Sequence, residues 1–310
     1  MLNWRIGCCD ENLFSADFAN HAERERKRIN KWVEERSNGR FEDIIIPGSI
    51  DPLTRAIVAN AIYFKGQWIE PFDERETYPD DFILSNGDLV EVQFMSKCVS
   101  SARYAAFNGD GSLYPTPDTI DLHDDDPDCY PDEDGFLMLE LCYKGDAFSM
   151  LLIAPQAEDN LPTIERNLDF SSFESCTRKL QTRRVDTLIP KFRLGDSKCL
   201  NQVMSGMGMQ RVFRSPLEKK GADLRGICPI EDKARQLYLS EVVHRTFLDV
   251  NEKGTEAVAV TLAKKKAAMK KVRKMVPFIP EFYADRPFIL MIRHRTTDLI
   301  LFLGRVVDPR

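Results

Sequence analysis

The sequence lacks the features that mark several common protein classes. Its 310 residues include no apolar run long enough to span a bilayer and no Asn-x-Ser/Thr glycosylation site. The first residues lack the basic start and the apolar run of a secretory signal. With a net charge of -6, any nucleic-acid function would have to rest on a local basic patch. These absences argue against a membrane protein and, taken alone, favour the cytosol.

Motifs of metal sites and of common enzyme classes are also missing. The eight cysteines include no Cys-x-x-Cys pair, and apart from the adjacent Cys8 and Cys9 they are widely spaced. A zinc site is therefore not expected, and reduced thiols are favoured over a disulfide framework. There are four histidines and no Gly-x-Ser-x-Gly, His-Glu-x-x-His or phosphate-binding glycine loop. The sequence predicts a protein that is not an enzyme and that binds no metal or cofactor.

The sequence does contain enough apolar residues to build a large core, because hydrophobic residues make up 43% of the chain. Apolar side chains form one stripe among the charges of residues 21–36, which predicts an amphipathic helix. Further helices are expected near 159–181 and 198–209. Strands are expected at 54–68, 82–84, 90–95, 136–141, 149–154, 185–192, 237–250, 288–292 and 299–306. Many strands and few helices predict an α+β fold with mostly antiparallel sheets.

One segment departs from this composition. Residues 108–135 contain ten acidic residues and several prolines. Like charges at this density repel one another and are costly to bury. The segment is therefore predicted to be a solvated loop insertion.

Between residues 252 and 276, a strand-forming stretch is joined to a strongly basic one. From Thr255 to Ala263 every second residue is small, whereas the intervening residues are larger or charged. A period of two is typical of a strand, and one slender face would let it fit between two others. Its alanine content also suits an exposed helix. In the basic run from Lys264 to Lys274, seven of eleven residues are Lys or Arg.

Several motifs in this chain resemble those of the serpins, a family of protease inhibitors. The sequence Phe-Tyr-Ala-Asp-Arg-Pro-Phe-Ile-Leu-Met-Ile at residues 282–292 fits the family signature at every position. Other likenesses are to the closing strand (299–309), the central strand of the large sheet (60–68), the helix over it (29–33), a short turn (221–224) and the strand and hinge before the reactive loop (243–257). The resemblance covers roughly residues 13–309.

The resemblance implies the serpin fold, in which a large, mostly antiparallel sheet is accompanied by further sheets and overlying helices. It is expected as a single domain over residues 1–310 that lacks the family's N-terminal helices. It further implies that residues 252–280 form a hinge and an exposed reactive loop. A serine protease cleaves that loop, and the freed hinge inserts into the large sheet and carries the protease with it. The implied function is suicide inhibition of a serine endopeptidase.

By the same resemblance, the hinge residues are Glu252, Gly254, Thr255, Ala257 and Ala259. Gly254 would supply backbone freedom where the loop folds back, and Thr255 would be the first inward side chain to enter the sheet. Val258 and Val260 are the alternate residues of this strand and would face outward, where β-branched side chains favour a strand. Asn60, Trp68 and His244 are assigned to the region where the sheet opens.

The cleavage site within the loop has two candidate positions. The family's usual spacing from Glu252 places it near Ala268 and Met269, whereas counting back from Phe288 places it near Val276. The candidate scissile residues are therefore Ala268, Met269, Lys270, Lys271, Arg273 and Lys274. Because the run is basic, the favoured target is a trypsin-like protease with an acidic specificity pocket.

The basic run from Lys264 to Lys274 has other interpretations. It is also typical of a solvated charged loop, or of a patch that binds heparin or nucleic acid. The alternative function is a non-inhibitory serpin-fold binding protein that uses this loop on a polyanion or nucleic acid. The family resemblance implies an extracellular location, whereas the missing glycosylation site and the scattered cysteines favour the cytoplasm.

Overall fold

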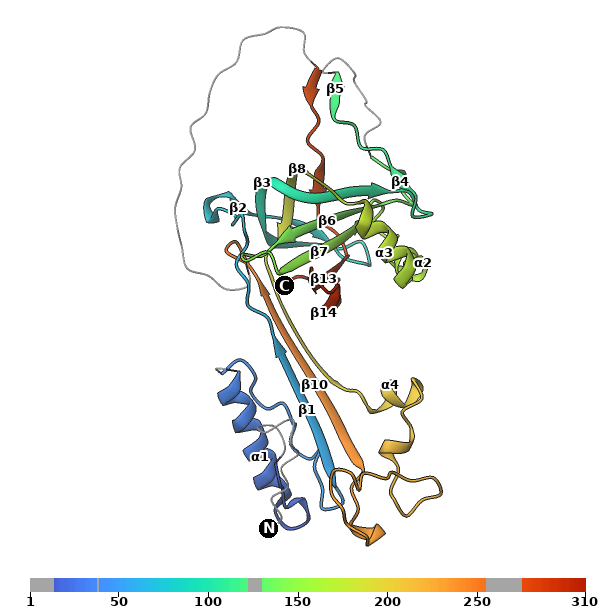
Figure 1. The fold of residues 1–310 in the computed structure, drawn as a ribbon. Helices are drawn as coiled ribbons and strands as arrows, with labels where there is room; N and C mark the ends of the chain where they lie inside the picture. Colours follow the sequence, from blue (N-terminus) through green and yellow to red (C-terminus); the bar gives the residue numbers. More distant parts are fainter. Residues whose placement is uncertain (1–13, 38, 122–129, 255–274) are drawn as a thin grey trace. The chain divides into compact units, whose positions relative to one another are not determined.

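The computed structural model describes residues 14–37, 39–121, 130–254 and 275–310 (Figure 1). The chain forms two compact units. The first unit comprises Met1–Phe64 and Leu194–Leu248, and the second comprises Lys65–Arg193 and Asp249–Arg310. Each unit is therefore built from two stretches of chain that are distant in sequence.

The first unit contains a long helix and a three-stranded sheet. Helix α1 spans Phe18–Arg36 and is capped by Asp17, whose side chain accepts a hydrogen bond from the backbone N–H of Asn20. The strand order is β1-β10-β9, with β1 at Ala56–Tyr63, β10 at Leu239–Val250 and β9 at Phe192–Cys199. β1 and β10 run parallel. Between β9 and β10 lie α4 (Asn201–Gly206) and the 3-10 turns η2 (Arg211–Phe213) and η3 (Lys233–Arg235).

The core of the first unit lies between α1, the loop after it and one face of the sheet. Val33 of α1 and Val243 of β10 are buried in it. Asn30 ties the loop to the helix, because its side chain accepts from the N–H of Ile45 and donates to the carbonyl of Ile45, both at 2.9 Å. Alternate residues of β1 pack against this core: Ile57, Ala59, Ala61 and Tyr63.

The second unit is built on a nine-stranded sheet with the order β12-β8-β3-β6-β7-β13-β14, to which β2 and β4 are added through β3. In chain order the strands are β2 (Thr77–Ile83), β3 (Leu89–Phe107), β4 (Leu113–Tyr114), β6 (Phe136–Cys142), β7 (Phe148–Pro155), β8 (Gln181–Pro190), β12 (Glu281–Tyr283), β13 (Phe288–His294) and β14 (Leu299–Val306). All these pairings are antiparallel except the parallel pair β12 and β8. A separate pair joins β5 (Thr119–Asp121) to β11 (Met275–Pro277).

The core of the second unit is formed where two helices pack on this sheet. Helices α2 (Leu161–Asn167) and α3 (Phe170–Lys179) contribute buried side chains that include Ile164 and Phe173. Strands β6, β7 and β13 are almost entirely buried, which explains their nearly continuous apolar sequences. One further 3-10 turn, η1, covers Glu74–Glu76.

The predicted α+β class with mostly antiparallel strands is confirmed. The strand expected at 54–68 is shorter than predicted, because β1 ends at Tyr63 and residues from Lys65 onward belong to the second unit. The helix expected near 159–181 is divided into α2 and α3. The short strands β4 and β5 lie within the acidic segment 108–135, whose loop insertion stays a prediction. No helix in the described part of the chain is long and apolar enough to cross a membrane.

Candidate functional site

The predicted hinge begins directly after β10 with a tight turn at residues 251–254. Asn251 N donates to the carbonyl of Gly254 at 3.0 Å, and Gly254 N donates to the carbonyl of Asn251 at 3.1 Å. Gly254 has φ +124, a conformation that side chains with a Cβ rarely adopt. A Cβ at this position would also lie 2.2 Å from the carbonyl oxygen of Gly66. Glycine is therefore required here for both its backbone angle and its lack of a side chain.

The turn is held by residues 66–72, which we call the hinge cradle. The backbone N–H of Trp68 donates to the carbonyl of Lys253 at 3.1 Å, and that of Phe72 donates to the carbonyl of Glu252 at 2.7 Å. Gln67 forms an isolated antiparallel bridge with Gly254. The cradle therefore pairs with the hinge as a short, irregular ladder.

Trp68 fixes the cradle in the core of the second unit. Its side chain is 2% exposed, and its indole stacks on Tyr143 with ring centroids 4.5 Å apart. The indole N–H donates to the carbonyl of Asn251 at 3.0 Å. One aromatic side chain therefore contributes both packing and a hydrogen bond to the start of the hinge.

Glu252 is a buried acidic residue with two partners. Its side chain accepts a hydrogen bond from the hydroxyl of Thr77 at 2.9 Å and pairs with Lys191 Nζ at 3.2 Å. Burial alone would raise the pKa of Glu252, but these contacts and backbone hydrogen bonding outweigh it, so the pKa lies below its usual range. Glu252 is therefore charged at neutral pH, and its partners anchor the hinge to β2 and to the residue after β8.

Asn60 and His244 meet in the first unit, on neighbouring parallel strands. They are register partners in the pairing of β1 with β10. The amide Nδ2 of Asn60 lies 3.1 Å from Nδ1 of His244, a hydrogen bond between the two strands. The structure thus brings together two of the three residues assigned to sheet opening, while Trp68 belongs to the second unit with the hinge.

The remaining predicted site residues lie outside the described residues. They are Thr255, Ala257 and Ala259 of the hinge and Ala268, Met269, Lys270, Lys271, Arg273 and Lys274 of the candidate scissile region. Within the described ranges, His, Cys, Asp and Glu side chains nowhere form a group of three or more that would hold a metal ion.

Sequence reasoning missed several residues around the hinge. Thr77 and Lys191 are 175 and 61 residues away from Glu252 in sequence. Tyr143, which stacks on Trp68, follows the buried strand β6 and has no local feature that marks its role. These residues are identified only once the sheet order is known.

Comparisons with known proteins agree with this architecture. A family model described as "Serpin (serine protease inhibitor)" matches residues 8–309. Serpin B6 of Macaca fascicularis is 33% identical over 295 residues, covering 94% of this chain and 68% of that protein. Leukocyte elastase inhibitor of Sus scrofa is 33% identical over 305 residues, covering 96% and 70%.

The solved structure of thyroxine-binding globulin in complex with thyroxine matches with a TM-score of 0.71 at 27% identity, covering 96% of this chain and 67% of that one. This chain thus spans about two thirds of the length of the relatives named here. The likeness confirms the fold that the motifs predict. The chain belongs to the serpin family of serine protease inhibitors.

Proposed function

We propose that this chain inhibits serine endopeptidases by a suicide mechanism, in which cleavage of its reactive loop lets the hinge insert into the sheet. The observation that carries this proposal is the parallel pairing of β1 with β10, the strand from which the hinge emerges. A chain that turns back at the end of β10 and enters between the two strands would run antiparallel to both. Insertion would then replace one parallel pairing with two antiparallel pairings, which are the more stable kind per residue.

The sequence after Gly254 supports insertion. Thr255, Ala257 and Ala259 are small and lie at every second position, so in a strand they would all face the core. Val258 and Val260 lie between them and would face outward. If roughly ten residues insert and each new ladder hydrogen bond contributes about 1 kcal/mol net, the gain is on the order of 10 kcal/mol. Buried side chains add to this. A gain of this size is comparable to the free energy of unfolding of a typical protein domain, so it is sufficient to distort a bound protease.

The favoured target is a trypsin-like protease. The similar leukocyte elastase inhibitor is named as an inhibitor of an elastase, which supports protease inhibition in general. In this chain, the candidate scissile residues include Lys270, Lys271, Arg273 and Lys274, whose side chains fit an acidic specificity pocket. Residues 252–280 act in this proposal as hinge and bait within a single serpin domain.

Incubation with trypsin tests this proposal. The wild-type chain should give a covalent adduct that survives denaturing electrophoresis. Thr255→Arg places a long charged side chain at a position that would face the core, which should block insertion. The loop should then be cleaved without adduct formation. Glu256→Arg changes the adjacent outward position and is the matched control, which should retain the adduct. Clean cleavage of the wild type without adduct would rule out inhibition, and an adduct of equal yield with Thr255→Arg would rule out insertion.

Seven basic residues among the eleven from Lys264 to Lys274 also support a second candidate, a non-inhibitory protein that binds heparin or another polyanion. Retention on immobilised heparin should then fall steeply with salt. It should also disappear when the seven basic side chains are replaced by Gln. Retention that is unchanged by these replacements contradicts this candidate.

We infer a cytoplasmic location in place of the extracellular one that the family resemblance alone implies. The five cysteines within the described residues are free thiols: Cys98, Cys142, Cys176, Cys199 and Cys228. Reduced thiols are typical of proteins that function in the cytoplasm. Alkylation of intact cells followed by mass spectrometry should find these thiols unpaired, and disulfide-linked peptides would contradict the inference.

A further inference from the structure

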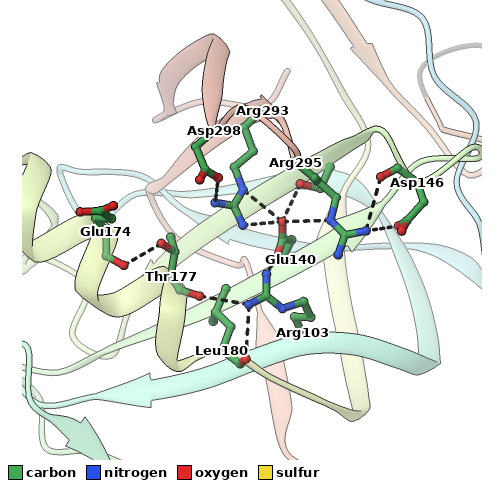
Figure 2. Close-up of polar contacts among 10 residues, drawn as sticks. Arg103, Glu140, Asp146, Glu174, Thr177, Leu180, Arg293, Arg295 and Asp298 are labelled. Atoms are coloured by element: carbon green, nitrogen blue, oxygen red, sulfur yellow. Dashed lines mark hydrogen bonds and ion pairs between the residues drawn. The ribbon is translucent and has the colours of Figure 1, made fainter.

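The second unit contains a cluster of charged side chains around a fully buried carboxylate (Figure 2). Glu140 of β6 is 0% exposed. It accepts hydrogen bonds from the hydroxyl of Ser149 at 2.6 Å, from Arg293 Nη2 at 2.7 Å and from Arg103. Arg295 Nε lies 3.9 Å from the same carboxylate. Three guanidinium groups therefore surround one buried negative charge.

The charges in this cluster are not balanced in the interior. The other two carboxylates, Asp146 and Asp298, pair with Arg295 and Arg293, but their side chains are 66% and 71% exposed. Water screens exposed carboxylates, so they offset less of the positive potential than a buried carboxylate does. Burial alone would raise the pKa of Glu140, but Ser149 and the guanidinium groups outweigh it and keep the pKa below its usual range. Among the groups of this cluster that are shielded from water, three guanidinium groups therefore face one carboxylate.

A cavity of about 200 Å³ lies beside this cluster. Its apolar lining residues include Trp68, Phe72, Val99 and Leu141. Arg103 and Arg295 line the same cavity, as do Asp146, which pairs with Arg295, and the hydroxyl-bearing Ser101 and Thr182. The cavity thus combines apolar side chains with a few charged and polar groups, the combination that orients small organic ligands.

The two arginines that line this cavity have N–H groups without a hydrogen-bond partner among the described residues. Arg295 uses Nη1 for Asp146, and Arg103 uses Nη1 for Glu140 and Nη2 for the carbonyls of Thr177 and Leu180. Among the described residues, the hydrogen bonds of these side chains leave Arg295 Nη2 and Arg103 Nε uncommitted.

Glu70 also lines the cavity, but its carboxylate is already engaged. Its two oxygens accept from the backbone N–H groups of Ser100 and Ser101 at 3.0 and 3.1 Å. These N–H groups belong to an irregularity in β3, where the register with β8 shifts between Val99 and Ala102. The partial positive charges of these N–H groups offset the charge of Glu70, so it opposes an anionic ligand only weakly.

We propose that this cavity binds a small monocarboxylate that carries a compact apolar group, such as an aromatic ring. The carboxylate would lie against Arg103 and Arg295, and the apolar group would lie against Trp68 and Phe72. The size is suitable, because a cavity of about 150 Å³ already accommodates benzene. Guanidinium groups that are largely shielded from water, as Arg103 and Arg295 are, favour an anion over a neutral ligand of the same shape. This binding does not depend on whether the chain inhibits a protease.

Phenylacetate is the probe, and its neutral analogue phenylacetamide is the matched control. Calorimetric titration of the full chain should show that phenylacetate binds at least about tenfold more tightly, since a charge-assisted hydrogen bond is lost with the amide. In nitrogen-proton spectra, phenylacetate should move the indole N–H signal of Trp68, assigned by comparison with Trp4→Phe and Trp32→Phe variants. Equal affinities for the two compounds, or an unmoved Trp68 signal, would overturn the proposal.

Variants give a second test. Arg295→Gln should weaken phenylacetate binding about tenfold. Arg305→Gln is the matched control, because Arg305 is 61% exposed, pairs with Glu165 and does not line the cavity. It should leave the affinity unchanged. A similar loss in both variants would indicate non-specific attraction by surface charge and would contradict the proposal, as would an unchanged affinity in Arg295→Gln.

Discussion

Replacing Gly254 with Ala tests whether the hinge turn is held as closely as the structure indicates. The new Cβ would lie 2.2 Å from the carbonyl oxygen of Gly66 and 2.7 Å from the Cα of Gln67, far inside normal contact distances. The turn and the cradle must therefore separate. The φ of +124 adds strain for any residue with a side chain.

The expected cost is the sum of two effects. Backbone strain contributes about 1–2 kcal/mol. Separation of the turn from the cradle breaks the hydrogen bond from Trp68 N to the carbonyl of Lys253 and the bridge between Gln67 and Gly254, at about 1 kcal/mol each. The free energy of unfolding should therefore fall by about 3–4 kcal/mol.

Gly87→Ala separates these two effects. Gly87 also has a positive φ, +82, but nothing lies within 4 Å of a Cβ built at this position. It should cost only the backbone strain, about 1–2 kcal/mol. Urea denaturation of the wild type and both variants, followed by tryptophan fluorescence, measures the difference. Equal losses in Gly254→Ala and Gly87→Ala would show that the close approach of Gly66 to the turn contributes nothing, and would refute the reasoning.

Two further substitutions test the buried carboxylates. Glu252→Gln should lower the free energy of unfolding by about 1–2 kcal/mol at pH 7. The pKa of Glu252 in the folded chain lies below the 4.5 of a free glutamate. The difference between wild type and variant should therefore be complete above pH 4.5 and vanish as the pH falls through the folded pKa. Urea titrations at pH 7 and pH 3 check this, and an unchanged difference would contradict it. Glu140→Ala removes the buried carboxylate that the buried Arg293 shares with Arg103, so it should cost about 3–5 kcal/mol and lower the Tm. The control Glu165→Ala, which removes only the partner of the exposed Arg305, should cost less than about 1 kcal/mol, and a similar loss in both would refute the argument.

Features set by local sequence were predicted well. The apolar stripe of residues 21–36 predicts α1, and the apolar runs at 136–141 and 149–154 predict β6 and β7, because burial of these elements depends on their own side chains. Strand β3 was predicted only at 90–95, although it extends to Phe107. Its continuation contains Ser100 and Ser101, and Glu70, distant in sequence, satisfies their backbone N–H groups.

The candidate site was predicted only in part for the same reason. Gly254 and Glu252 follow from the family motif, but the motif does not identify what holds them. Glu252 meets Thr77 and Lys191 because β2 and β8 both pair with β3, which brings distant residues to one place. The cavity beside Glu140 likewise combines side chains from several strands and loops. No local pattern encodes such groupings, because they depend on the order of strands in the sheet.

Under the proposed mechanism, the pairing of β1 with β10 is also a barrier to insertion. Eight residues of β1 are in register with β10, and the Asn60 to His244 hydrogen bond adds a side-chain contact. Separating the strands therefore costs roughly 8 kcal/mol if each paired residue contributes about 1 kcal/mol. This free energy is lost before the two new strand pairings are formed. The hydrogen bonds from the cradle to the carbonyls of Glu252 and Lys253 must also break before the hinge enters. If the chain works by insertion, this step should be slow to begin, and the hydrogen bonds from Trp68 and Phe72 to the hinge oppose it.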